Sequence, residues 1–109
     1  MTEADLHKRV VSFLRAKKLL FCHVPNGGPR EKKWARAGRS FGIYPGVPDL
    51  LIFTPTETFV GVALELKTKR GKVSPAQERW LSQLRDARWL ALVADDYDKI
   101  VTFINTVYP

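Results

Sequence analysis

Two short apolar runs of this chain carry charged side chains at one end. Asp49 stands directly before the run 50–53, and a second apolar run ends in Glu65-Leu66-Lys67. Both runs are bounded by Pro, Gly and Thr residues, a pattern that is typical of β-strands. Because side chains two residues apart point to the same face of a strand, Glu65 and Lys67 are expected to project together.

The segment between the two runs predicts how they lie relative to each other. Residues 54–58 are few enough for a hairpin, which places the start of the first strand beside the end of the second. Asp49 is then expected next to Glu65 and Lys67. Two carboxylates and an ammonium at one spot suit a divalent cation and a phosphate, because Mg²⁺ takes oxygen ligands from carboxylates, water and phosphate groups.

The same residues also have a simpler interpretation. Acidic side chains at strand ends are usually solvated, and a Glu-x-Lys pair on one strand face is often a surface ion pair. The convergence of the two fragments favours a functional role over that alternative. Glu65 lies inside an otherwise apolar strand, and a buried carboxylate costs free energy unless it is paired or bound to metal.

Composition and charge narrow the class of protein. We expect the 109 residues to form a single domain, 1–109, with a real hydrophobic core. A formal net charge of +7 points to an anionic partner, with nucleic acid as the leading candidate. We expect no signal peptide and no membrane span. Cys22, the single cysteine, is expected to be a small core residue rather than a nucleophile, which fits a reducing cytoplasm.

Sequence patterns predict the order helix, strand, strand, strand, helix, strand, helix. The last strand is almost entirely apolar and is therefore expected to be buried. The first helix is expected from Glu3 to about Lys17, a second begins after Ser74, and a third after Asp95 or Asp96. The strands are expected over Leu19–Val24, Leu50–Phe53, the run that ends at Lys67, and Trp89–Ala94.

Two polar residues fall on the apolar faces of the predicted helices. Glu3 belongs to the stripe of the first helix, so it should point toward the core side at the helix end. The alternative is that acidic residues are simply favoured in first turns. Gln77 is the third residue of a helix capped by Ser74, and this capping role explains it as well as a role in a site does.

Two basic segments adjoin the predicted site, one after the turn 25–29 and one after Lys67. Both are expected to contact nucleic-acid phosphates, with Trp34 available to stack on a base, although such segments are often only solvated surface. The residues assigned to DNA binding are Arg30, Lys32, Lys33, Arg36 and Arg39 in the first segment and Lys69, Arg70 and Lys72 in the second.

Taken together, these motifs resemble the VRR-NUC domain (virus-type replication-repair nuclease), a branch of the PD-(D/E)xK superfamily. The motifs occur in order over nearly the whole chain: Glu3, Asn26-Gly27-Gly28, Gly46-Val47-Pro48-Asp49, Glu65-Leu66-Lys67 and Ser74-Pro75-Ala76-Gln77. The resemblance implies an α/β fold with a restriction-endonuclease-like core, in which helices flank a mixed four-stranded sheet. One departure is the stretch 87–89, where related chains often carry a glycine.

The resemblance also implies roles for individual residues. Asp49 and Glu65 match the metal ligands and, with the backbone carbonyl of Leu66, would hold Mg²⁺ or Mn²⁺. Lys67 matches the catalytic lysine, which orients or deprotonates the attacking water or stabilises the transition state. Glu3 matches an acid that holds a second metal or a metal-bound water, and Gln77 matches the helix glutamine.

Stand-alone members of this size are similar to phage and bacterial proteins that act as homodimers on branched DNA, such as four-way (Holliday) junctions, in DNA repair. The resemblance therefore implies work in the cytoplasm of a bacterium or of a phage-infected cell. The short chain leaves little room for a separate sequence-reading element, which favours recognition of DNA shape. Aromatic residues that could form a dimer interface, or equally the core, are Trp34, Tyr44, Trp89 and Tyr108.

Two alternatives to a structure-selective nuclease remain. The first is a basic nucleic-acid-binding module without catalysis, in which the carboxylates only form salt bridges. The second is a nonspecific or restriction-like nuclease. Nicking of DNA that depends on a divalent cation would exclude the binding module without catalysis. A comparison of cleavage rates on linear and branched substrates distinguishes a structure-selective nuclease from a nonspecific or restriction-like one.

Overall fold

A computed structural model describes residues 2–25, 38–69 and 71–109, with only the backbone described for Arg39. The helices and strands follow the predicted order, with one short 3-10 helix added. Their bounds are α1 (Glu3–Ala16), β1 (Phe21–His23), η1 (Gly38–Phe41), β2 (Leu50–Ile52), β3 (Gly61–Leu66), α3 (Pro75–Asp86), β4 (Trp89–Ala94) and α4 (Tyr97–Val107). None of these described helices is long and apolar enough to cross a membrane.

The four strands form one mixed sheet in the order β1-β2-β3-β4. The pairs β1–β2 and β2–β3 are antiparallel, whereas β3 and β4 run parallel and are connected through α3. The predicted hairpin is confirmed, since Leu50 of β2 lies opposite Leu64 of β3. The start of β2 therefore lies beside the end of β3, as the site prediction requires.

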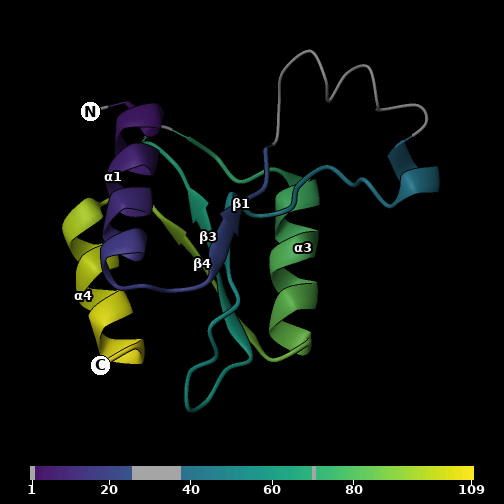
Figure 1. Cartoon of the computed structure of the whole chain (residues 1–109). Helices are drawn as coiled ribbons and strands as arrows, with labels where there is room; N and C mark the ends of the chain where they lie inside the picture. The colour runs from purple at the N-terminus through teal and green to yellow at the C-terminus, as the bar shows by residue number, and fades with distance from the viewer. Residues whose placement is uncertain (1, 26–37, 70) are drawn as a thin grey trace.

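Helices cover both faces of the sheet, with α1 and α4 on one side and α3 on the other (Figure 1). Alternate residues of β3 point to opposite layers, because side chains alternate along a strand. Leu64 and Leu66 join the core made with α1 and α4, whereas Ala63 packs with Leu81 of α3 and Ala91 of β4. By this alternation Glu65 belongs to the face that α3 covers.

The helices α1 and α4 run in the same direction. The guanidinium of Arg9, in the middle of α1, lies 4.0 Å from the ring centre of Tyr97, the first residue of α4. Near their ends, the ammonium of Lys17 donates a 2.8 Å hydrogen bond to the carbonyl oxygen of Tyr108. The helices α3 and α4 each follow the carboxyl end of one of the two parallel strands, and α1 runs in the same direction as α4. All three helices therefore begin at the same end of the sheet, where β3 and β4 end (Figure 1).

Two burial predictions are wrong, and both concern strands at an edge of the sheet. Cys22 is exposed rather than in the core, and in β4 only Ala91 is buried, while Val93 is 41% exposed. Both β1 and β4 lie at an edge of the four-stranded sheet, so each has a strand neighbour on one side. Cys22 lies on the α3 face, and α3 packs over β3 and β4 instead of β1.

Strand ends also differ from the predictions. The first two strands are shorter than expected, and β3 ends at Leu66, so Lys67 stands just beyond it. The backbone N–H of Lys67 nevertheless donates to the carbonyl of Ala94, which continues the pairing with β4 by one residue. Helix α1 ends at Ala16, and Lys17 is its C-cap.

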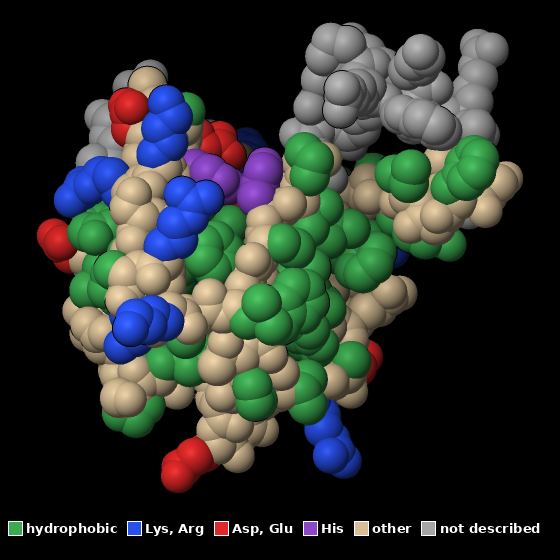
Figure 2. Space-filling model, viewed as in Figure 1, with side chains coloured by type: hydrophobic (Ala, Val, Ile, Leu, Met, Phe, Trp, Pro, Cys, Tyr) green, Lys and Arg blue, Asp and Glu red, His purple; other side chains and the backbone are tan. Residues whose placement is uncertain are grey.

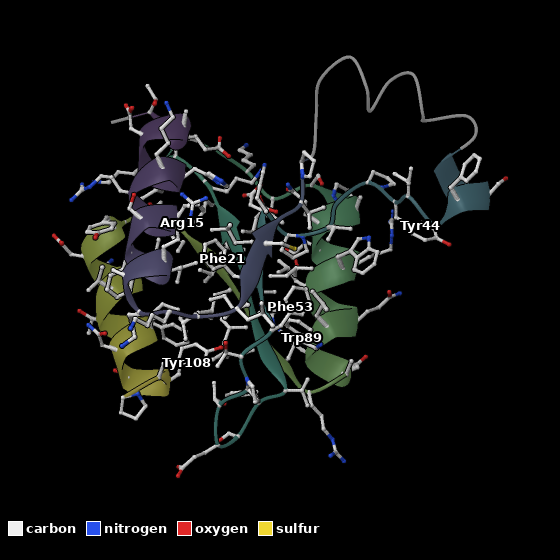
Figure 3. All side chains as sticks on the ribbon, viewed as in Figure 1. Arg15, Phe21, Tyr44, Phe53, Trp89 and Tyr108 are labelled. Atoms are coloured by element: carbon white, nitrogen blue, oxygen red, sulfur yellow. The ribbon has the colours of Figure 1, made fainter. Side chains whose placement is uncertain are left out.

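The four interface candidates separate into different environments. Tyr108 is 8% exposed and donates a 2.6 Å hydrogen bond to the carbonyl of Thr54, so it belongs to the core. Trp89 is half-buried against Phe53, edge to face (Figure 3). Tyr44 is 47% exposed beside Trp80, and Trp34 lies outside the described residues.

The stretch 87–89, where chains of the resembled family often carry a glycine, contains a residue with a strained backbone. Arg88 has a φ of 71°, in the left-handed region where glycine is the usual residue. An L-residue in that conformation costs roughly 1–2 kcal/mol. Arg88 still connects the turn to β3, because its carbonyl accepts a 3.0 Å hydrogen bond from the N–H of Val60. The departure therefore affects a turn that is remote from Asp49 and Glu65.

Candidate active site

The approach to β2 is fixed against the first turn of α3. Gly46 has a φ of +90°, and a Cβ placed on it would lie 2.5 Å from the carbonyl carbon of Ala76. Only glycine tolerates both the conformation and the contact. Two residues later Pro48 is fully buried. These two residues bring the chain into β2 close to the beginning of α3, which is where Asp49 stands.

Asp49 is held through both its side chain and its main chain. Its carboxylate oxygen Oδ2 accepts a 2.8 Å hydrogen bond from the backbone N–H of Leu66. Its carbonyl oxygen accepts a 2.8 Å hydrogen bond from the N–H of Val24. The residue is thus attached to β3 on one side and to the end of β1 on the other, and the predicted convergence with the end of β3 is confirmed.

Glu65 is a buried carboxylate that lacks a full set of partners. It is 2% exposed, and among the described residues its oxygen Oε1 is buried without a hydrogen-bond partner. Its other oxygen, Oε2, lies 4.0 Å from the ammonium of Lys67. An unsatisfied buried carboxylate oxygen is costly, so this position is under-coordinated in the protein alone.

The environment of Glu65 changes its acidity. Burial, more than any other cause, raises its pKa from 4.5 to about 8. The nearby Asp49 carboxyl raises the pKa further, the charge of Lys67 lowers it, and the charge of Glu3 raises it. Without a bound cation, Glu65 therefore carries a proton at neutral pH.

Glu3 is close enough to act on this group although it is not buried. Glu3 is exposed in the first turn of α1 and is not part of the core. Its negative charge nevertheless raises the pKa of both Glu65 and His7. The apolar face of α1 packs on the core, and Glu3 at the start of the helix then acts on the site through its charge.

Gln77 forms the helix cap that the sequence predicts. Its side-chain oxygen accepts a 2.8 Å hydrogen bond from the N–H of Ser74, and its own N–H donates to the Ser74 hydroxyl at 3.2 Å. This cap occupies the amide oxygen of Gln77. Any contact with a substrate or with metal-bound water would therefore come from its NH₂ group.

Of the predicted DNA-contact residues, Lys69 and Lys72 are described, and both are exposed in the loop that joins Lys67 to α3. The side chain of Arg39 is not described, and Arg30, Lys32, Lys33, Arg36 and Arg70 lie outside the described residues, as does the Asn26-Gly27-Gly28 turn.

The sequence patterns did not indicate a further basic surface, which the structure shows on α1. Lys and Arg side chains gather along α1 (Figure 2), where Lys8, Arg9 and Arg15 are exposed.

Two histidines beside the site were also missed. The rings of His7 in α1 and His23 in β1 pack edge to face with their centres 4.4 Å apart. Burial lowers the pKa of His7, as does His23, whereas Asp49 and Glu3 raise it. The sequence contains part of this information, since His7 follows Glu3 by one helical turn and His23 is the last residue but one of a predicted strand.

The donor set fits a divalent cation of the magnesium type. Among the described residues no group of three or more His, Cys, Asp and Glu side chains is placed to hold a metal. Mg²⁺ does not require such a group, because it is commonly held by one or two carboxylates while water and phosphate complete its shell. Asp49 and Glu65 supply two carboxylates, and a cation there would satisfy the unpartnered Oε1 of Glu65.

Comparison with known proteins agrees with the geometry. A family model described as the VRR-NUC domain matches residues 1–95, which include every residue assigned above to the site. A solved structure described as a "VRR_NUC domain protein" is 22% identical, with a TM-score of 0.81 over 98% of this chain and 88% of that chain. At this identity, the likeness shows the fold alone. No curated protein matches the chain.

Proposed function

Because the chain belongs to the VRR-NUC domain family, nucleases of the PD-(D/E)xK type, we propose that it is a divalent-metal-dependent DNA endonuclease. The observation that carries this proposal is Glu65, a buried carboxylate beside Asp49 with one oxygen that has no partner among the described residues. A structural salt bridge would not leave this oxygen unpaired. A basic binding module without catalysis would also have no use for it.

The residues of the site would have different roles in phosphodiester hydrolysis. Asp49 and Glu65, with the carbonyl of Leu66, would hold Mg²⁺ or Mn²⁺, which supplies charge neutralisation at the phosphate and an acidified water. Lys67 is 18% exposed at its side chain and lies beside Glu65, so its ammonium can reach a phosphate oxygen or the attacking water. Glu3 is available to hold a second cation or a metal-bound water.

Replacing Lys67 with alanine is expected to separate cleavage from metal binding. Cleavage should fall by about 10²–10³-fold, as when one transition-state donor is removed, because the ammonium no longer reaches the phosphate. Mn²⁺ affinity measured by calorimetry should persist, because Lys67 is not a ligand. Lys18→Ala, an exposed lysine just after the end of α1 and outside the proposed DNA contacts, is the control and should keep both properties. Loss of Mn²⁺ binding in Lys67→Ala would contradict the assigned role.

We further propose that the substrate is branched DNA. The support comes from the family and from the small size of the chain, which favours recognition of shape over sequence. The experiment is a panel of linear duplex, flap and four-way substrates of equal length, cut in Mg²⁺. Equal rates on all three would favour the nonspecific alternative, and absence of divalent-dependent nicking on every substrate would favour the binding module.

The exposed lysines of the loop before α3 are expected to contact phosphates. The double variant Lys69→Gln/Lys72→Gln should reduce the slope of log affinity against log salt by about 0.9 for each lost contact, about 1.8 in total. The control is Lys18→Gln/Arg88→Gln, which removes the same charge from exposed residues at the opposite end of the sheet. Equal slopes for the two double variants would mean that this loop faces away from DNA.

The working unit is proposed to be a homodimer that cuts two strands of one junction. One site cuts one strand per encounter, and a two-fold dimer is the simplest match to a two-fold substrate. Light scattering at micromolar concentration should therefore show twice the mass of one chain. Mixed dimers of wild type and Asp49→Ala should nick one strand without resolving the junction. Paired cuts by mixed protein at the wild-type rate per site would show that the sites act alone.

A further inference from the structure

The carbonyl of Asp49 receives a second hydrogen bond, from a side chain outside all the motifs above. His23 Nδ1 lies 2.9 Å from this oxygen, which also accepts the N–H of Val24. A carbonyl oxygen can only accept, so the proton of this bond must sit on Nδ1 of His23. The ring therefore donates to the main chain of the residue whose carboxylate faces Leu66.

The ring of His23 is itself held in place. His23 is the last residue of β1 and lies opposite Leu50, the first residue of β2. The ring of His7 packs against it at an interplanar angle of 71°. Figure 2 shows the two histidines side by side where α1 meets β1. The edge-to-face pair links α1 to the strand end, so the donor at Nδ1 has limited freedom to rotate away.

Asp49 needs such support because of where it stands. It precedes the first residue of β2, so it lies at the end of the ladder, where the hydrogen bond from the Val24 N–H extends the pairing with β1 by one residue. A metal ligand binds well only when its orientation is fixed in advance, and groups that orient a ligand through hydrogen bonds typically change metal affinity or activity by about 10–100-fold.

We propose that His23 is a positioning residue for the metal site: its Nδ1–H fixes the main chain of Asp49 and so directs the Asp49 carboxylate before a cation binds. This inference rests on the proposed metal-dependent function and extends it to a residue that contacts neither metal nor substrate. It requires the hydrogen-bond donor, and the packing of the ring against His7 only limits how far that donor rotates.

Three substitutions separate the donor from the ring. His23→Asn keeps an N–H donor close to the position of Nδ1 but removes the ring. His23→Phe keeps a ring against His7 but has no donor. His23→Gln moves the donor one bond further out and serves as a second test if His23→Phe does not fold. Cys22→Ser, at the exposed neighbour in β1, is the control.

Two measurements are made on each variant. Calorimetry with Mn²⁺ should give a dissociation constant raised by about tenfold or more in His23→Phe and His23→Gln, and close to wild type in His23→Asn and Cys22→Ser. In metal-free protein, hydrogen exchange at the Leu66 amide reports the position of the Asp49 carboxylate directly, because that amide donates to it. This exchange should be faster in the Phe and Gln variants alone.

Wild-type affinity and wild-type Leu66 exchange in His23→Phe would overturn the proposal. An Asn variant as impaired as the Phe variant would also overturn it, because the effect would then belong to the shape of the ring. If the wild-type protein bound no Mn²⁺ and cut no DNA, the proposed function would fail. The exchange of the Leu66 amide would still decide the role of His23.

Discussion

Glu65→Gln is expected to abolish DNA cleavage while the protein stays folded. The amide keeps the shape of the side chain but cannot supply an anionic ligand, and Asp49→Asn should act in the same way. A bound metal ion contributes several kcal/mol to the transition state, and each 1.4 kcal/mol is tenfold in rate, so a loss of about 10³-fold or more is expected. Plasmid nicking in Mg²⁺ measures the loss.

The control for this experiment is Glu57→Gln, which removes a carboxylate from the exposed turn between β2 and β3. This variant should cut like the wild-type protein. Calorimetry with Mn²⁺ should show binding in the control and none in Glu65→Gln or Asp49→Asn. Cleavage at the wild-type rate by both site variants would leave the two carboxylates without a catalytic role.

Metal-free protein is expected to lose stability as the pH rises from about 5 to 8. The folded protein holds a proton on Glu65 with a pKa of about 8, whereas the ordinary value is 4.5. Between these values the folded state binds more protons than the unfolded state, so the free energy of unfolding falls as the pH rises. Each pKa unit corresponds to about 1.4 kcal/mol, which makes the total effect a few kcal/mol.

Glu65→Gln isolates this contribution, because glutamine does not titrate. Denaturant unfolding in EDTA at several pH values should show a flatter profile for the variant, which becomes the more stable protein above about pH 8. Adding Mn²⁺ should reverse the order, since the cation binds the deprotonated carboxylates of the wild-type protein. Parallel profiles for the two proteins would contradict a proton on Glu65. The same substitution is therefore expected to stabilise the metal-free protein and inactivate it.

The central part of the site could be predicted from the sequence because local rules determine it. A short turn between two apolar runs dictates the hairpin, and the hairpin dictates that Asp49 meets Glu65. The cap formed by Ser74 and Gln77 is likewise local, since four consecutive residues contain the whole motif. These features depend on spacing along the chain and not on how distant segments pack.

The remaining features depend on packing between distant segments. The exposure of Cys22 follows from the position of β1 at a sheet edge and from where α3 lies, and neither is encoded near Cys22. The contact between His7 and His23 depends on how α1 is positioned relative to the end of β1, which is set by packing between segments distant in the sequence. The exposed position of Glu3, together with its influence on Glu65, reflects the same docking of α1.

The helices α1, α3 and α4 all begin at the same end of the sheet, and this arrangement affects the electrostatic approach of DNA to the proposed site. A metal-dependent nuclease must gather carboxylates at one place and still attract a polyanion to it. The N-terminus of a helix carries roughly half a positive charge from its aligned peptides, so the three helices contribute a positive field at this end of the sheet, which the acidic side chains of their first turns reduce. Such a field acts before contact and raises the rate of encounter, and dissolved salt weakens it. The polarity of the helices thus offsets part of the repulsion that the carboxylates of the site exert on an approaching phosphate backbone.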